Sequence, residues 1–262
     1  MTASTQRSSV LRAALASGRG PVLGTWVKIP AIETFELVAL AGFDFVVIDL
    51  EHSPMDLATV SHIVSTALLS RVSPLVRVPG HDIALAQRLL DAGAEGIVVP
   101  HVDTVEQARA VVSGTRFPPL GTRGVGSTSR AGQWGATARE EYLRFGQEEV
   151  VVIAQIESGE GVRNAGEIAA LEGIDALLIG AADLAVSEQA DESDPAVADL
   201  IAQIVGAGAA NGVPVGNAGP ATAASVRAAA DMGLAFTMLS NDASLFGSAT
   251  RTAVETARTE QR

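Results

Sequence analysis

The sequence predicts an α/β protein with a (β/α)8 barrel, the TIM-barrel fold, because eight apolar runs that resemble strands alternate with helical stretches along the chain. Parallel strands need crossover helices, and a right-handed series of such units can close on itself. In a closed barrel the loops that follow the strands line one mouth, where catalytic groups collect. Charged residues at the carboxyl ends of the runs include Asp49, Glu51, His52, Arg77, Glu157 and Asp183.

Each strand is expected where a short apolar run ends at glycine, proline or polar residues, and each helix where apolar residues recur every three or four positions. The first four strands are expected at residues 21–29, 45–50, 73–78 and 96–101, and their helices from residue 31 and over 55–70, 81–92 and 106–112. The last four strands are expected at 150–157, 175–181, 213–217 and 235–241, and their helices at 161–171, 195–210, 221–232 and 243–257. No run is followed by a GxGxxG phosphate-binding turn, so a closed barrel is favoured over an open, doubly wound sheet.

The chain is expected to form one domain over residues 1–262, with residues 1–20 as an N-terminal extension or helix. Between residues 116 and 147 the strand–helix pattern breaks for longer than an ordinary connection lasts. Long connections of this kind often carry function. We therefore expect this stretch to be an active-site flap or a subunit contact.

Composition narrows the class of protein. The 262 residues are 47% hydrophobic and 18% charged, as in a globular protein, and the absence of cysteine leaves oxygen and imidazole ligands for any metal ion. The net charge of -12 and the lack of a basic stripe argue against a nucleic-acid partner. No apolar run reaches the ~20 residues that span a bilayer, and the first residues lack the apolar core of a signal peptide. We expect a cytoplasmic protein without a membrane partner.

Two acidic residues directly follow neighbouring strands. Glu157 comes after the apolar run VVVIAQI, and Asp183 comes after LLIGAA. An ionised carboxylate at the end of a buried strand is costly unless a cation neutralises it, and two carboxylates on adjacent strands suit a hard divalent ion. Each acid also lies where a helix begins, and negative charge is favoured there. Position alone leaves both explanations open, metal binding and helix capping.

His52 and Arg77 are further candidates at the strand ends. Of the four histidines, only His52 lies in a charged cluster at a strand end, the segment DLEH, and a histidine can carry protons near neutral pH. Asp49 and Glu51 are candidates to orient it. Arg77 interrupts the apolar run LVRV, and a buried arginine needs a partner. We expect it to face an anion in the mouth, and the alternative is that it bridges a carboxylate such as Asp49.

Lys28 is the only lysine in the chain. An aldolase that forms a Schiff base needs a lysine on a strand, so an amine mechanism would depend on Lys28 alone, and metal activation is favoured instead. The sequence has no GxSxG elbow, and aromatic residues make up only 4% of it, which disfavours serine hydrolase and glycosidase chemistry. The segment GTRGVGS, with Arg123, offers backbone amides to an anionic group but is also typical of a tight turn.

Six segments spread along the chain carry a family resemblance: AGFDFVVIDLEHSP, LVRV, LLDAGAEGIVVPHV, RFPPLGTRGVGS, QIES and IGAADL. With them the chain resembles the HpcH/HpaI aldolases from about Gly24 through the last helix. That family comprises metal-dependent class II pyruvate aldolases, among them 4-hydroxy-2-oxoheptanedioate and 2-dehydro-3-deoxyglucarate aldolases. The resemblance implies a lyase that joins a pyruvate enolate to an aldehyde, or performs the reverse cleavage.

The resemblance also implies a metal site and a substrate site. The glutamate of the QIE segment and the aspartate of the ADL segment would hold the metal, here Glu157 and Asp183, and the ion would be Mg²⁺, Mn²⁺ or Co²⁺. Gln155 would steady the oxygens around the ion, and the backbone near Ala182 would bind the carboxylate of pyruvate. No other cofactor is expected.

For proton transfer, the resemblance pairs His52 with Asp91 as a base dyad. Arg77 would stabilise the charge on the enolate oxygen. Lys28 stands where the resemblance leads us to expect a small or apolar residue, and its charge would bind an acidic acceptor or a second carboxylate of the substrate. The usual GPADLS segment reads GAADLA here, and the following loop is short, so the acceptor is left open.

Two other functions remain as alternatives. A related biosynthetic enzyme would condense an oxaloacetate-type substrate, as in citrate synthesis, with the same metal and enolate. A non-catalytic barrel would keep the anion-binding site but lack turnover. The resemblance further implies a homo-oligomer, a trimer or hexamer, in which the final helix is exchanged between neighbours.

Overall fold

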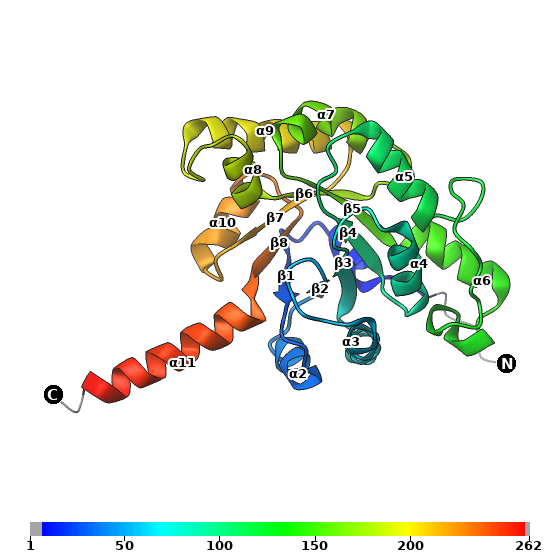
Figure 1. Ribbon diagram of the computed structural model, residues 1–262, viewed down its shortest axis with the longest axis horizontal. Coiled ribbons are helices and arrows are strands. Elements are labelled where there is room, and N and C mark those ends of the chain that lie inside the picture. Colours follow the sequence, from blue (N-terminus) through cyan, green and yellow to red (C-terminus); the bar gives the residue numbers. More distant parts are fainter. Residues whose placement is uncertain (1–6, 260–262) are drawn as a thin grey trace.

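The computed structural model describes residues 7–259, which contain a closed barrel of eight parallel strands (Figure 1). Each strand pairs with its sequence neighbours, and β8 closes the barrel against β1. The predicted (β/α)8 fold is confirmed. The strands are β1 (Val22–Val27), β2 (Phe45–Asp49), β3 (Ser73–Arg77), β4 (Gly96–Val99), β5 (Val151–Ile156), β6 (Ala176–Ile179), β7 (Val215–Gly219) and β8 (Phe236–Asn241).

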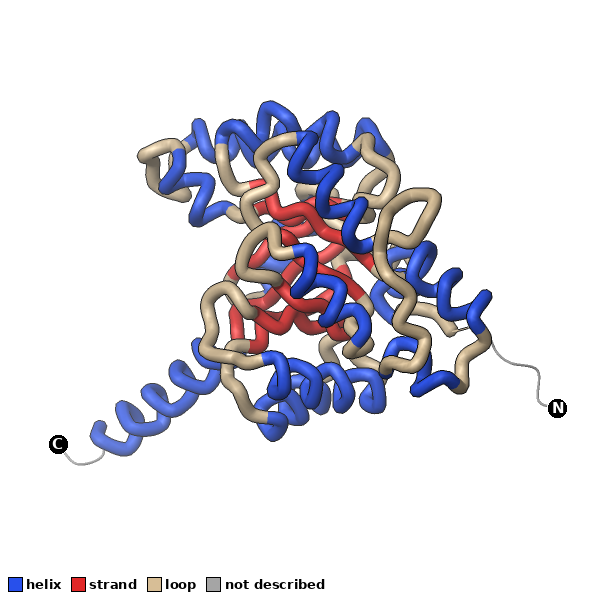
Figure 2. Tube along the Cα trace, turned by 45° about the vertical axis from the view of Figure 1, so that its right-hand side comes forward, coloured by secondary structure: helices blue, strands red, loops and turns tan. Residues whose placement is uncertain are grey.

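Helices surround the strands on the outside of the barrel (Figure 2). The eight expected helices are present with shifted ends, α1 falls within the expected extension 1–20, and α8 was not predicted because its seven residues follow β6 almost without a break. The helices are α1 (Val10–Ala16), α2 (Ile32–Leu40), α3 (Leu57–Ser70), α4 (Ile83–Asp91), α5 (Val105–Thr115), η1 (Arg130–Gly135), α6 (Arg139–Arg144), η2 (Phe145–Glu149), α7 (Gly159–Ala169), α8 (Ala181–Ser187), α9 (Pro195–Asn211), α10 (Ala223–Asp231) and α11 (Asp242–Thr259).

Side chains alternate along the strands between two apolar cores, because successive residues of a strand point to opposite faces. In β2, Phe45 and Val47 lie in the core inside the barrel, and Val46 and Ile48 lie in the core between strands and helices. All four are fully or almost fully buried. The same alternation decides which residues at the strand ends reach the mouth.

Two aromatic rings fill part of the barrel interior. Phe45 and Phe236 meet edge to face with 5.9 Å between ring centroids. A side chain on Gly24 would come within 2.3 Å of the Phe45 ring, and one on Gly216 within 2.2 Å of the Phe236 ring. These glycines therefore provide the space that the two rings occupy.

The α1 helix seals the amino end of the barrel. Its Leu11 belongs to the interior core and is 1% exposed. Arg12 fixes the helix there, because its Nε donates to the carbonyl of Glu149 at 3.0 Å and its Nη2 to that of Val150 at 2.9 Å. The interior is thus closed at this end, and the mouth lies at the other.

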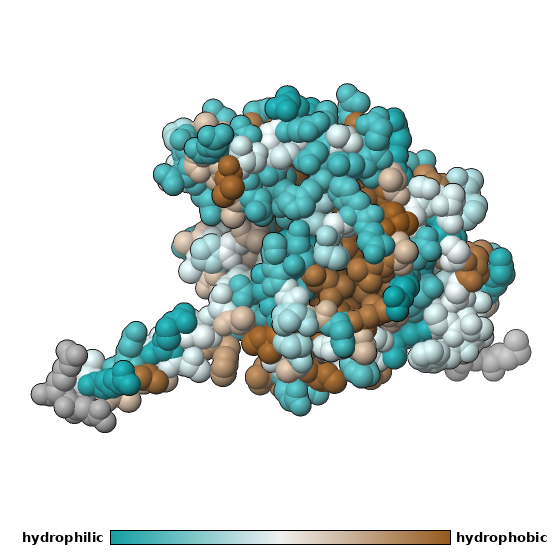
Figure 3. Space-filling view, viewed as in Figure 1, coloured by the Kyte–Doolittle hydropathy of each residue, from teal (hydrophilic) through white to brown (hydrophobic). Residues whose placement is uncertain are grey.

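The last helix, α11, projects away from the barrel (Figure 1). It is anchored at its first residue, since the Asp242 carboxylate accepts from the backbone N–H groups of Lys28 and Ile29, both at 2.9 Å. Beyond this point it forms a largely hydrophilic arm (Figure 3), although Phe246 is 66% exposed. The exchange of this helix between subunits stays a prediction. Among residues 7–259, no helix has both the length and the apolar character needed to cross a bilayer.

Candidate active site

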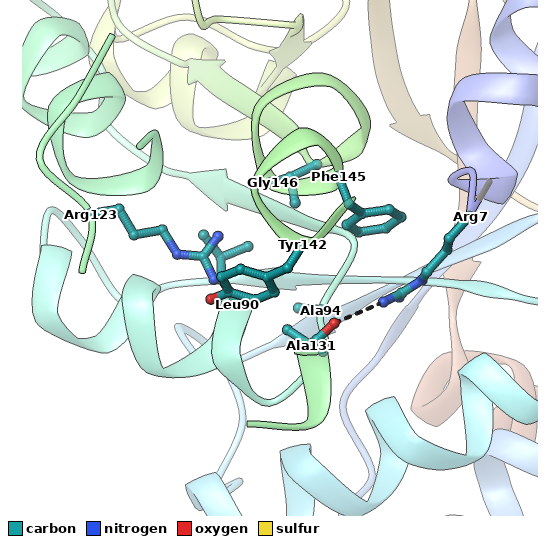
Figure 4. A pocket seen from close by; sticks show the side chains of 10 residues that line it. Arg7, Leu90, Ala94, Arg123, Ala131, Tyr142, Phe145 and Gly146 are labelled. Atoms are coloured by element: carbon teal, nitrogen blue, oxygen red, sulfur yellow. Dashed lines mark hydrogen bonds between the residues drawn. The ribbon is translucent and has the colours of Figure 1, made fainter. Parts of the chain in front are cut away.

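The barrel mouth contains a cavity of about 330 Å³ at the carboxyl ends of the strands. A second hollow, drawn in Figure 4 between Arg7, Tyr142 and Phe145, holds only about 10 Å³, which is room for one water molecule. The mouth cavity is the candidate site for a metabolite, because it lies where the strand ends bring the predicted site residues together. The predicted site residues that line it are Lys28, His52, Arg77, Gln155, Ala182 and Asp183.

A buried ion pair lies on one side of the mouth. The alternation that points Phe45 and Val47 into the barrel also points Asp49 inward, and Arg77 is its register partner on β3. Arg77 Nε donates to Asp49 Oδ1 at 3.0 Å, and Nη2 donates to Oδ2 at 2.7 Å. Burial raises the pKa of Asp49, but the hydrogen bonds and charge of Arg77 outweigh it and hold this pKa below its ordinary value.

Arg77 has further partners. Its Nη1 lies 3.0 Å from Glu51 Oε2, and its guanidinium stacks 4.2 Å from the Trp26 ring centroid. The structure therefore shows the carboxylate-bridging alternative. A guanidinium has five N–H groups, so two remain beyond the three used on Asp49 and Glu51. Contact between Arg77 and an anion in the cavity stays a prediction.

Lys28 extends from the end of β1 into the same cluster. Its Nζ lies 3.2 Å from Asp49 Oδ2. Schiff-base lysines are typically activated in an apolar pocket or beside another cation, whereas this amine is paired with a carboxylate. The surroundings therefore favour Lys28 as a fixed positive charge at the mouth over Lys28 as a nucleophile.

Glu157 lies at the opposite side of the mouth, directly after β5, and is 3% exposed. Its Oε1 accepts the backbone N–H of His101 at 2.7 Å, and its Oε2 accepts a short hydrogen bond from Gln155 Nε2. Burial raises the pKa of Glu157 by more than these donors lower it. An acid in this position lacks a full counter-charge.

The surroundings of Glu157 fit a hard cation. Gln155 Oε1 is buried and has no hydrogen-bond partner within residues 7–259, so an oxygen ligand lies unused beside the carboxylate. In the described part of the chain, no three carboxylates or imidazoles form a complete ligand set, so amide, water or substrate oxygens would have to contribute. The mouth has four carboxylates and two positive side chains, Lys28 and Arg77. The two negative charges left over match the charge of a divalent ion. These carboxylates are Asp49, Glu51, Glu157 and Asp183.

Asp183 and Ala182 belong to the first turn of α8, where the leading N–H groups lack intrahelical acceptors. Asp183 is exposed and lines the cavity. A Cβ on Gly180, the residue before the helix, would lie 2.6 Å from Glu157 Oε2. Glycine at this position is therefore what lets α8 approach Glu157.

His101 is a site residue that the sequence analysis did not select. It follows β4, and its Nδ1 lies 2.9 Å from Glu157 Oε1, while its Nε2 lies 3.3 Å from Glu51 Oε1. Because no charged residue adjoins it in GIVVPH, it looked like an ordinary strand-end residue. The order of the strands could have pointed to it, because a residue at the end of β4 lies between the ends of β3 and β5.

The expected dyad of His52 and Asp91 does not form within one chain. His52 is exposed at the mouth, and its Nε2 lies 3.7 Å from Glu51 Oε2. Asp91 ends α4, and a helix delivers the chain to the amino end of the next strand, opposite the mouth. There Asp91 Oδ1 accepts from Arg123 Nη2 at 2.9 Å. The direction of the chain therefore separates the two residues.

The direction of the chain also places the long connection that was expected to be an active-site flap or a subunit contact. Residues 116–147 lead from α5 to the amino end of β5, so they do not cover the mouth of their own barrel. Arg123 is 4% exposed, paired with Asp91 and placed 4.7 Å from the Phe117 ring centroid. It stabilises this connection instead of facing an open anion site. A subunit contact through the connection stays a prediction.

Comparison with known proteins identifies the family. A model of the family described as HpcH/HpaI aldolase/citrate lyase matches residues 23–244. The chain belongs to this family. It is 40% identical over 213 residues to a hydroxypyruvate/pyruvate aldolase of Deinococcus radiodurans, a match that covers 79% of this chain and 76% of the relative. It is 35% identical over 247 residues to a 5-keto-4-deoxy-D-glucarate aldolase of Escherichia coli, with 94% and 95% covered.

Two solved structures have the same barrel. A family protein from Burkholderia cenocepacia J2315 superposes with a TM-score of 0.88 at 35% identity, covering 96% of this chain and all of that one. The citrate synthase SbnG superposes with a TM-score of 0.87 at 28% identity, covering 96% and 98%. The family and the similarity to two aldolases make this HpcH/HpaI family member a carbon–carbon lyase, and its fold is a TIM barrel.

Proposed function

We propose that this HpcH/HpaI family member is a divalent-metal-dependent aldolase that makes or breaks the bond between a pyruvate-type 2-oxo acid and an aldehyde. The observation that carries the proposal is the buried Glu157 carboxylate beside the unpartnered Gln155 Oε1. The similarity to a hydroxypyruvate/pyruvate aldolase supports the class of substrate. Mg²⁺, Mn²⁺ and Co²⁺ all suit these oxygen ligands.

Each residue of the mouth would have its own role in the reaction. Glu157 and Asp183 would hold the divalent ion, which supplies the Lewis acidity that makes the methyl group of the 2-oxo acid acidic. The backbone N–H of Ala182 would bind the carboxylate of the 2-oxo acid. His52 would carry the proton, and the free N–H groups of Arg77 would stabilise the enolate oxygen.

A His52–Asp91 pair would have to form between two copies of the chain, because the two residues lie at opposite ends of one barrel. This requirement agrees with the homo-oligomer, a trimer or hexamer, that we propose. The exposed Phe246 on the projecting α11 supports an arm that packs on a neighbour. We also propose that the enzyme works in the cytoplasm.

Methyl-proton exchange tests the proposed reaction. NMR would follow the exchange of pyruvate methyl protons into deuterated water with Mn²⁺ and with excess chelator. We expect exchange that depends on the metal. Bound metal without any exchange would contradict the proposal.

Lys28 is expected to select acceptors that carry a second negative charge. Replacing it by methionine keeps most of its length and removes its charge, so KM for a carboxylated aldehyde should rise about 10-fold, as for loss of one charge-assisted contact of about 1.4 kcal/mol. KM for a neutral aldehyde should change little. Steady-state kinetics with both aldehydes measures the difference, and an equal change for both would contradict this role.

A second candidate function is condensation of an oxaloacetate-type acid. The superposition on the citrate synthase SbnG favours it. Oxaloacetate and an electrophilic 2-oxo acid would be incubated with the metal-loaded enzyme, and the products analysed by mass spectrometry. A condensation product formed without pyruvate exchange would select this function over the aldolase.

A further inference from the structure

His101 connects two of the four carboxylates of the mouth, those of Glu157 and Glu51. Its Nδ1 lies 2.9 Å from Glu157 Oε1, and its Nε2 lies 3.3 Å from Glu51 Oε1. Its backbone N–H also donates to Glu157 Oε1, at 2.7 Å. One residue thus approaches the same carboxylate oxygen with both its backbone and its ring.

The backbone of His101 is held in an uncommon conformation. Its φ is +53°, in the left-handed region that residues other than glycine seldom occupy. His81 supports this turn, because its Nε2 lies 3.0 Å from the carbonyl oxygen of Pro100 and 3.1 Å from that of His101. The turn directs the N–H of His101 at Glu157, so the strain is associated with the arrangement of the site.

The two oxygens of Glu157 therefore differ in what they can still accept. A carboxylate oxygen has two lone pairs. Oε1 faces the backbone N–H and the ring of His101, whereas Oε2 accepts one hydrogen bond, from Gln155 Nε2. Oε2 is also the oxygen next to Gly180, at the entrance to α8. It is the oxygen of Glu157 with a lone pair left for a cation.

We propose that His101 is a positioning residue of the cation site: it engages Glu157 Oε1 and thereby presents Oε2, beside the Gln155 amide, to the divalent ion. The inference rests on the proposed function, because it needs a cation at Glu157. Partners that fix a ligating carboxylate change metal affinity by about 10–100-fold when they are removed. The ring of His101 acts on Glu157 and not on the substrate.

Two substitutions separate the ring from the backbone. His101→Gly keeps the left-handed φ and the backbone N–H but removes the ring, so the dissociation constant for Mn²⁺ should rise about 10-fold. His101→Asn also tolerates this φ, and its amide can donate from near the position of Nδ1, so it should recover most of the affinity. Electron paramagnetic resonance of free Mn²⁺ measures both constants. His62→Asn, on the exposed face of α3, is the matched control.

The exchange assay completes the test. Raising the Mn²⁺ concentration should restore most of the exchange rate that His101→Gly loses at limiting Mn²⁺, because the ring is engaged with Glu157 and Glu51. If the wild type binds Mn²⁺ and exchanges protons, but His101→Gly binds Mn²⁺ with the same affinity, the role of His101 is overturned and the proposed function is not. Slow exchange at saturating Mn²⁺ overturns it too, because the ring would then act on the substrate. A wild-type protein that binds no Mn²⁺ overturns the proposed function, and the role of His101 with it.

Discussion

Glu157→Gln is expected to slow the metal-dependent exchange of pyruvate methyl protons about 100-fold or more, which corresponds to a loss of about 2.7 kcal/mol of transition-state stabilisation. Glutamine has the shape of glutamate and can still accept from the His101 N–H, but it lacks the charge that would hold the divalent ion. The measurement is the exchange rate by NMR across a range of Mn²⁺ concentrations. Glu160→Gln, at an exposed position of α7, provides the matched control. Equal rates in the two variants would contradict the assignment of Glu157.

The same substitution should stabilise the metal-free protein at neutral pH. The folded pKa of Glu157 is raised, so the folded state binds its proton more tightly than the unfolded state, whose glutamate pKa is about 4.3. The free energy of unfolding therefore falls as pH rises through the folded pKa. Glu157→Gln removes this fall, so its advantage over the wild type should appear at pH 7 and disappear near pH 4. Urea unfolding of the variant and the wild type, with chelator present, measures this difference at pH 7 and near pH 4.

Asp49→Asn is expected to lower the free energy of unfolding by about 3 kcal/mol at pH 7, because it leaves the buried Arg77 without its bidentate partner. The contribution of Asp49 to the free energy of unfolding depends on pH in the opposite direction from that of Glu157. The folded pKa of Asp49 lies below its unfolded value of about 3.9, so its contribution is present above that pH and is lost as pH falls through the folded pKa. The difference between variant and wild type should shrink accordingly in acid.

Urea unfolding at pH 7 and at acid pH measures this effect. Asp199→Asn, at an exposed position of α9, is the control for loss of one aspartate charge and should change stability by less than about 0.5 kcal/mol. An Asp49→Asn protein as stable as this control at pH 7 would show that Glu51 alone satisfies Arg77.

The barrel was predictable because its signal is local: apolar runs of strand length alternate with helical periodicity, and charged residues follow the runs. Because a buried arginine needs a partner, the sequence also offered Asp49 as an alternative partner of Arg77. The motifs alone do not show that His52 and Asp91 are separated within one chain. The separation follows from the fold, because α4 leads away from the mouth and ends at Asp91 near the amino end of the barrel. The role of His101 could not be predicted from the sequence, because its contacts depend on a left-handed turn and on the side chains of Glu51 and Glu157, which follow β2 and β5.

The α1 helix, which closes the amino end of the barrel, also decides how molecules can reach the site. Its Leu11 packs in the same interior core as Phe45 and Phe236, so the barrel is filled below the mouth and has no passage through it. A substrate has to enter, and a product has to leave, through the one mouth at the carboxyl ends of the strands. Two reactants that meet there have to share a cavity of about 330 Å³.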